Sequence, residues 1–204
     1  MAKKKMNKKG KRVPWNKGVE VGRRAPLSAA EVTRIRKLLV KRGDSGLKHL
    51  ALFSTAVDTM LRSPDLLDLK VGDVRKRNGV MRDSIALSPR GKRCNAVQCI
   101  VSKTTMSVLA KLIRDTSKKP RDYLFTGRVG GGLQPLSARQ FNRIVKGWVA
   151  DAGLDESAYG SESLRRTGAI AMLRRRASME AIRDALGLQD VDHATKYLRD
   201  IPQR

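Results

Sequence analysis

Cysteine is scarce in this chain of 204 residues, which contains only Cys94 and Cys99. Neither has a second pair of cysteines or histidines at the spacing of metal ligands, which argues against a structural zinc site. The chain also lacks any run of about 18 apolar residues, and no apolar segment of the signal-peptide type follows its basic N-terminus. We therefore expect a reduced cytoplasmic protein with no metal, no cofactor and no membrane partner.

Acidic residues are also few. The chain has 19 Asp and Glu against 44 Lys and Arg, which gives a formal net charge of +25 at pH 7. This excess favours a polyanionic partner, because each phosphate that a cation neutralises releases condensed counterions. Double-stranded DNA is the leading candidate, and it places the protein with the nucleoid. On charge alone, a basic chromatin-like or ribosomal binder is the rival interpretation.

Residues 1–27 are expected to form a basic arm, and residues 28–204 one folded domain. Up to Ser28 the chain holds ten Lys and Arg against one acid, Glu20, so this segment carries +9 of the total charge. It has no apolar period, and we expect it to stay disordered until it meets DNA; a solubilising tail is the alternative. Trp15 favours contact, because an aromatic ring can pack on sugar or base while cations track phosphates. The expected DNA contacts are Lys3, Lys4, Lys5, Lys8, Lys9, Lys11, Arg12 and Lys17.

The pattern beyond the arm predicts a mainly α fold with a small antiparallel β-sheet. Capping boxes at 28–31 and 137–140 begin two of the helices. Short strand-like runs predict the sheet, whose last two strands are joined by the basic turn 89–93. The glycines of 127–132 lack the lysine of a phosphate-binding loop and indicate a plain loop. Helices are expected from 28, at 46–61, from 63, at 102–114, from 137, at 163–176, at 178–186 and around 197, and strands at 79–81, 84–87 and 96–101.

The most informative motifs are an arginine pair and a later tyrosine in the C-terminal quarter, with one further arginine between two earlier helices. They are Ser163-Leu164-Arg165-Arg166-Thr167, then Leu186-Gly187-Leu188 with Tyr197 nine residues further on, and Leu61-Arg62-Ser63-Pro64-Asp65-Leu66. Over roughly residues 28–200 this arrangement resembles the tyrosine recombinases of the phage integrase family. The resemblance implies the tyrosine recombinase catalytic-domain fold and a site-specific recombinase or integrase that cuts and rejoins DNA strands.

The resemblance assigns the nucleophile and the phosphate clamp. Tyr197 is expected to form a covalent 3′-phosphotyrosyl link that keeps the bond energy for religation. Arg62 and Arg165 are expected to hold the two non-bridging phosphate oxygens, whose geometry matches the guanidinium fork. Arg166 lies about 100° from Arg165 around the helix, so we expect only one of the two to face the site.

A general acid must protonate the departing 5′ oxygen, and in the family it is a lysine on the β-hairpin. Lys92 is the expected acid, and Arg90 is the alternative. An arginine would be a poor acid because it hardly releases its proton. Further DNA contacts are expected from Arg90, Arg93 and Arg166.

Two positions of the site depart from the family pattern. Glu162 stands where the family has its first histidine, and a carboxylate beside a phosphate is repulsive unless an arginine holds it or it is protonated. Leu188 stands where the family has a second donor to the phosphate, and leucine has no donor. His193, one turn before Tyr197, either reaches the site from a new direction or is an exposed residue at a helix start. The remaining His49, Tyr123 and Tyr159 are expected to have structural roles.

Two hypotheses follow, and a third is weaker. The chain is either an active recombinase or a catalytically degenerate relative that binds DNA as a regulator or accessory subunit. The chromatin-like interpretation explains the charge but not the presence of all three motifs at the spacing of the family. The chain has only the arm before its catalytic part and ends seven residues after Tyr197. We therefore expect a dimer or tetramer on DNA rather than a stable oligomer without it, and accessory DNA-bending proteins are further candidate partners.

Overall fold

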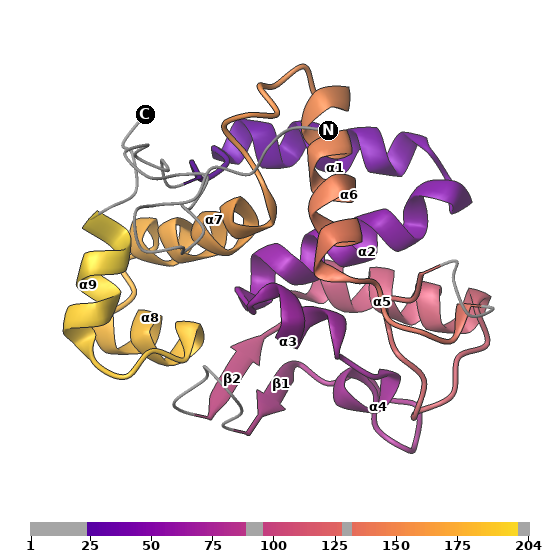
Figure 1. Cartoon of the computed structure of the whole chain (residues 1–204). Coiled ribbons are helices and arrows are strands. Elements are labelled where there is room, and N and C mark those ends of the chain that lie inside the picture. The colour runs from indigo at the N-terminus through magenta and orange to yellow at the C-terminus, as the bar shows by residue number, and fades with distance from the viewer. Residues whose placement is uncertain (1–23, 89–95, 128–131, 200–204) are drawn as a thin grey trace, which may run out of the picture.

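Helices dominate the described residues of the computed structural model, which are 24–88, 96–127 and 132–199 (Figure 1). The helices are α1 (Ala29–Lys41), α2 (Asp44–Thr59), α3 (Ser63–Leu67), α4 (Val71–Val74), α5 (Lys103–Asp115), α6 (Ala138–Asp151), α7 (Ser161–Arg174), α8 (Met179–Leu186) and α9 (Val191–Arg199), and the strands are β1 (Ser84–Leu87) and β2 (Val97–Ile100). The predicted fold class, mainly α with a small antiparallel sheet, is confirmed. Within these ranges no helix has both the length and the apolar character of a membrane span.

Serine caps begin α1 and α6 as the sequence predicted. Ser28 Oγ accepts a hydrogen bond from the Glu31 amide at 3.2 Å, and Glu31 Oε2 accepts one from the Ser28 amide at 2.7 Å. Ser137 and Gln140 form the same reciprocal pair, at 2.9 and 3.2 Å. These bonds satisfy amides that the first turn of a helix leaves without partners, so the start of each helix is encoded locally.

The ends of two helices differ from the prediction. α2 ends at Thr59, two residues before Leu61, because Met60 takes a left-handed conformation with φ of 51°. α7 begins at Ser161, two residues before the expected start, because Gly160 caps it and Ser163 Oγ accepts from the Gly160 amide at 3.1 Å. The earlier start places Glu162 in the first turn of α7.

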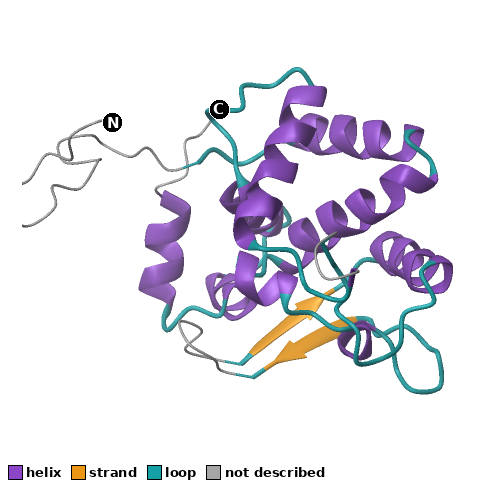
Figure 2. Cartoon of the chain, turned by 45° about the vertical axis from the view of Figure 1, so that its right-hand side comes forward, coloured by secondary structure: helices purple, strands orange, loops and turns teal. Residues whose placement is uncertain are grey.

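The two strands pair antiparallel and lie at one side of the helical body (Figure 2). Ile85 lies opposite Cys99, and both are buried, while Ile100 at the other face is 77% exposed. The predicted strand at 79–81 is wrong: Met81 makes only an isolated bridge to Arg75, because the chain turns at Gly79, where φ is 86°. The basic turn 89–93 of the hairpin lies outside the described residues.

The main core surrounds α2, whose central residues Ala51, Leu52 and Phe53 are fully buried. α1, α5 and α7 all pack against this helix (Figure 1). The Trp148 indole of α6 meets the Phe53 ring edge-on, with 5.5 Å between ring centroids, and donates to His49 Nδ1 at 3.2 Å. Burial lowers the pKa of His49, whose ring also meets the Trp148 indole edge-on.

A second, smaller apolar cluster attaches the C-terminal helices. Met60, Ala169, Ile182 and Leu186 form its buried centre, and the ring of Tyr197 packs against it. α8 and α9 lie beside α7 at one side of the molecule (Figure 1). The position of Tyr197 therefore depends on contacts between α7, α8 and α9 rather than on the main core.

The segment just before α1 is tied to α7. Ala25 and Leu27 are buried, the Leu27 amide donates to Thr167 Oγ1 at 2.8 Å, and the Arg166 guanidinium donates to the Arg24 carbonyl at 3.0 Å. The folded unit thus includes residues 24–27, which the sequence had assigned to the arm. The cations of residues 1–23 that were expected to contact DNA lie outside the described residues.

Candidate active site

Arg62 is held at the sharp turn between α2 and α3. The left-handed Met60 ends α2, Arg62 is extended with φ of −64° and ψ of 148°, and Pro64 lies in the first turn of α3. Proline favours this position because a helix start leaves its amides unpaired. The side chain of Arg62 consequently points away from α3 toward α7.

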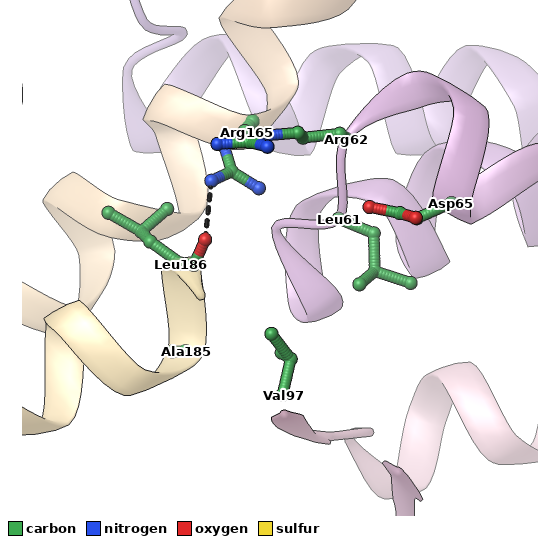
Figure 3. Close-up of a pocket in the computed structure, with 7 residues that line it drawn as sticks. All are labelled: Leu61, Arg62, Asp65, Val97, Arg165, Ala185 and Leu186. Atoms are coloured by element: carbon green, nitrogen blue, oxygen red, sulfur yellow. Dashed lines mark hydrogen bonds between the residues drawn. The ribbon is translucent and has the colours of Figure 1, made fainter. Parts of the chain in front are cut away.

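Arg62 and Arg165 lie side by side in a small hollow between α3, α7, α8 and β2 (Figure 3). The hollow combines two cationic side chains with an apolar floor and one acid. Its lining residues are Leu61, Arg62, Asp65, Val97, Arg165, Ala185 and Leu186. Two guanidinium groups at one opening can hold a phosphate by paired hydrogen bonds. The structure therefore brings together the two arginines that the sequence assigned as a clamp.

Arg165 is oriented by the main chain around it. The residue is 6% exposed, and its guanidinium donates to the carbonyl of Met60 at the end of α2 and to the carbonyl of Leu186 at the end of α8, the latter at 2.7 Å. Burial lowers the pKa of Arg165, although Tyr197 and Glu162 oppose this effect. Arg165 joins three helices and stays in one orientation before any ligand arrives.

Tyr197 lies where α9 meets the first turn of α7. Its hydroxyl donates to Glu162 Oε1 at 2.8 Å. The central guanidinium carbons of Arg165 and Arg166 lie 6.0 and 5.4 Å from the centroid of its ring. Burial, and next the charge of Glu162, raise the pKa of Tyr197 well above its usual value. Without a ligand the phenol therefore keeps its proton.

Arg166 also lies beside Tyr197, whereas Arg165 is the arginine of the pair that lines the hollow shared with Arg62. The two side chains leave the helix in different directions, but each is long enough for its guanidinium to reach the Tyr197 ring. Arg166 is 5% exposed, donates to the Arg24 carbonyl and lies 4.0 Å from Glu162 Oε1. Its assignment as a DNA contact stays a prediction, because in this structure its contacts lie within the protein.

Leu188 has an apolar environment. It follows Gly187, which ends α8 with φ of 58°, and its side chain packs on the cluster that also holds the Tyr197 ring. Leucine in this position helps to form the apolar surface on which the Tyr197 ring packs, but it provides no hydrogen-bond donor. Its chemistry differs from that of the donor that the family has at this position.

The other candidates have simple environments or lie outside the described residues. His193 is exposed and its ring contacts Asp190 Oδ1 at 2.7 Å, while the Tyr159 hydroxyl donates to Glu31 Oε1 at 3.0 Å. The Tyr123 ring lies below the Lys70 ammonium. In the part of the chain that the structure describes, no group of three or more His, Cys, Asp or Glu could hold a metal ion. Lys92, Arg90 and Arg93 lie outside the described residues.

A row of cations on α6 was not predicted from the sequence as a DNA-binding surface. Arg139 and Arg143 are exposed and Lys146 is partly exposed, whereas Phe141 and Trp148 on the opposite side of the helix are buried. Their i, i+4, i+7 spacing is the signal that could have found them. The Oδ1 atom of Asn142, on the same side of α6, accepts from the Ser161 amide at 3.1 Å, so this row borders the start of α7.

A comparison with protein-family models matches residues 25–204 to the phage integrase family. The chain belongs to the phage integrase family. The resemblance predicted from the motifs is confirmed, and the match begins at the buried Ala25, inside the segment that is tied to α7. Comparison with curated proteins gave no match.

Solved structures of other integrase-family members share the fold. The XerA recombinase has 19% sequence identity and a TM-score of 0.70, over 88% of this chain and 60% of its own. The XerH site-specific recombinase, bound to its difH substrate, has 19% identity and a TM-score of 0.69, over 94% of this chain and 55% of its own. The catalytic domain of bacteriophage HP1 integrase has 14% identity and a TM-score of 0.58, over 88% of this chain and 90% of its own. This family member thus spans little more than half of the XerA and XerH chains.

Proposed function

We propose that this protein is a site-specific DNA recombinase or integrase that cleaves and rejoins strands through a covalent bond between Tyr197 and a 3′ phosphate. One observation carries the proposal: the Tyr197 hydroxyl lies at the first turn of α7, and its ring lies against the same arginine, Arg165, that shares a small hollow with Arg62. A nucleophile and a cationic clamp supplied by separate helices meet in one place.

The residues have separate roles in this reaction. The Tyr197 oxygen bonds to phosphorus while the bond from phosphorus to the 5′ oxygen breaks. Arg62 and Arg165 stabilise the charge that develops on the non-bridging oxygens. Lys92, or Arg90 as the alternative, gives a proton to the departing 5′ oxygen. The phosphotyrosyl bond keeps the energy of the broken bond, and rejoining is the same step in reverse.

Double-stranded DNA is the proposed partner. The net charge of +25, the cations of residues 1–23 and the row on α6 all favour a polyanion. XerH is bound to difH substrate, and the Tn1549 transposon integrase is in complex with transposon right end DNA. Self-association as a dimer or tetramer on DNA and accessory DNA-bending proteins belong to the same proposal, as does a cytoplasmic location on the nucleoid.

A DNA-binding regulator is the second candidate, and Leu188 is the observation that favours it. A missing preorganised donor costs about 100- to 1000-fold in rate. Leu188 packs against an apolar cluster and has no hydrogen-bond donor in its own side chain. A regulator would keep the DNA-binding surface and the clamp but would not form the covalent bond.

Trapping on a nicked DNA substrate separates the two functions. The nick lets a short product diffuse away after cleavage, so the covalent intermediate cannot religate. The substrate is drawn from the flanks of the protein's own gene, and wild-type protein is expected to give a denaturant-resistant adduct whose cross-linked peptide contains Tyr197. Tyr197→Phe is expected to bind the same DNA and to give no adduct, because it lacks the attacking oxygen. If wild-type protein binds a DNA in a gel-shift assay but never forms the covalent adduct with it, the DNA-binding regulator is the better explanation.

Removal of the α6 cations tests the DNA-binding surface. Replacing Arg139, Arg143 and Lys146 with alanine is expected to weaken binding to any sequence and to reduce the slope of log K against log salt by about 0.9 for each phosphate that the variant no longer neutralises. Binding is measured by fluorescence anisotropy over a salt series. The control variant removes the same charge from Lys103, Arg114 and Lys119, on and just after α5. Equal salt slopes for both variants would mean that the α6 cations contribute only to the net charge of the protein and do not contact DNA phosphates.

A further inference from the structure

Glu162 and Tyr197 form a direct proton path between two helices. They are 35 residues apart, and the phenol hydrogen points along a 2.8 Å bond to Glu162 Oε1. The Glu162 side chain is about half exposed, at 47% of its surface, so its carboxylate lies at the protein surface rather than in the core. The nucleophile thus already donates its proton toward a group able to accept it.

Arg166 provides the second observation. It is 5% exposed, its Nε atom has no hydrogen-bond partner among the described residues, and this atom lies 4.0 Å from Glu162 Oε1. A buried donor without an acceptor is costly, so such a group commonly meets its partner in another state of the site. When the Tyr197 oxygen turns to phosphorus, Glu162 Oε1 is the nearest carboxylate oxygen for this donor.

We infer that Glu162 is a catalytic residue, the acceptor of the Tyr197 proton during strand cleavage, and that Arg166 positions its carboxylate. This inference rests on the proposed function. It gives a chemical task to the carboxylate, which the sequence placed in the site as repulsive to the phosphate unless an arginine holds it or it is protonated.

The step balances without a further reactant. The Tyr197 oxygen bonds to phosphorus and its proton moves to Glu162 Oε1, while the 5′ oxygen leaves with a proton from the hairpin acid. A free phenol is a much weaker acid than a carboxylic acid, but a phenol oxygen that is bonding to phosphorus loses its basicity, so the transfer accompanies bond formation. In religation Glu162 returns the proton to the tyrosine oxygen.

Arrival of DNA strengthens the acceptor. A phosphate bound to Arg62 and Arg165 places negative charge near the carboxylate, and a like charge favours the protonated form of a carboxyl group. In the free protein the carboxylate accepts the Tyr197 hydrogen bond, and its charge helps to raise the pKa of the phenol. The nucleophile is therefore unreactive until a phosphate occupies the clamp.

Glu162→Gln tests this role with little change of shape. The amide oxygen of glutamine can still accept the Tyr197 hydrogen bond, but it cannot take the proton. Single-turnover cleavage of the nicked substrate is expected to fall about 100-fold or more. DNA affinity should not fall, because the substitution removes a negative charge beside the phosphate. Glu162→His supplies a different base at the same position and is expected to recover part of the rate. Circular dichroism and thermal unfolding check that both variants are folded.

A substrate with sulfur at the 5′ bridging position distinguishes proton removal from the nucleophile from proton donation to the leaving group. A thiolate leaves without protonation because thiols are far more acidic than alcohols. The defect of Lys92→Ala is expected to disappear on this substrate, whereas that of Glu162→Gln is expected to persist. Rescue of Glu162→Gln by sulfur would assign Glu162 to the leaving group and overturn the inference.

Different experimental results would contradict the recombinase function and the catalytic role of Glu162. A wild-type adduct together with wild-type or faster cleavage by Glu162→Gln would overturn the role of Glu162 alone, since it would leave only repulsion of the phosphate. No wild-type adduct on DNA that is bound would overturn the recombinase function and this inference with it. A control without DNA follows the phenolate absorbance as the pH is raised, and Tyr197→Phe identifies which part of the signal belongs to Tyr197. Glu162→Gln should lower the pKa of Tyr197. An unchanged titration would contradict the hydrogen bond itself.

Discussion

Replacing Arg165 with lysine is expected to reduce adduct formation on nicked DNA by about 1000-fold. Arg165 is held by the carbonyls of Met60 and Leu186, and the remaining N–H groups of its flat fork are available to face a phosphate. A lysine ammonium concentrates its three donors at one point, so it cannot serve both carbonyls and the phosphate together. Burial also lowers the pKa of a lysine, which would weaken the positive charge of the clamp.

The same variant is expected to lose about 2 kcal/mol of unfolding free energy, because at least one of the two buried carbonyls would lose its partner. Urea denaturation followed by circular dichroism measures this loss without DNA. Arg174→Lys, at the exposed end of the same helix, is the matched control and should change neither property. Wild-type cleavage by Arg165→Lys would show that the guanidinium fork is not the clamp.

Gly168→Ala is expected to lower the free energy of unfolding by about 2–3 kcal/mol. A Cβ atom at Gly168 would lie 2.3 Å from the Val57 carbonyl oxygen and 2.3 Å from Met60 Cγ. The carbonyl belongs to the backbone of α2, so relief of the clash requires the two helices to separate. The loss exceeds the gain of up to about 1 kcal/mol that alanine brings to a helix interior.

Gly147→Ala in α6 is the matched control, because a Cβ at this helical position meets nothing within 4 Å. It should stabilise the protein by about 0.5–1 kcal/mol through helix propensity alone. Both variants are compared by urea denaturation. Movement of α7 away from α2 also displaces Arg165 from the Met60 carbonyl, so Gly168→Ala should cleave DNA more slowly even where it is folded. Equal stability of the two variants would refute the close contact between α2 and α7.

Local rules were enough for much of the fold. The capping boxes at Ser28 and Ser137 could be predicted because each bond joins residues three apart. The motif spacing identified Arg62, Arg165 and Tyr197, which the structure gathers at one end of α7. The start of a helix was predicted less accurately where two neighbouring residues could each cap it. Ser163 was taken as the start of α7, but its hydroxyl accepts from Gly160 and the helix begins two residues earlier.

Contacts between distant residues could not be predicted in this way. The bond between Tyr197 and Glu162 joins α9 to α7, and the bond from Arg166 to Arg24 spans 142 residues. The expectation for Arg166 considered only its direction from the helix axis. That direction could not show that α9 brings the tyrosine ring within reach of both long side chains.

The sequence by itself determined the secondary structure class, most helix starts, the family and the spacing that nominates Tyr197, Arg62 and Arg165 for the site, because these depend on periodicity, caps and short spacings. Tertiary structure decided which partners hold the site: Arg165 bonded to two carbonyls, Arg166 buried beside the ring, Leu188 in an apolar cluster and Glu162 as the partner of Tyr197. The physical reason is that hydrogen-bond partners and burial depend on the packing of α7 against α2, α8 and α9. That packing is set by the whole core, and no local pattern in the sequence records it.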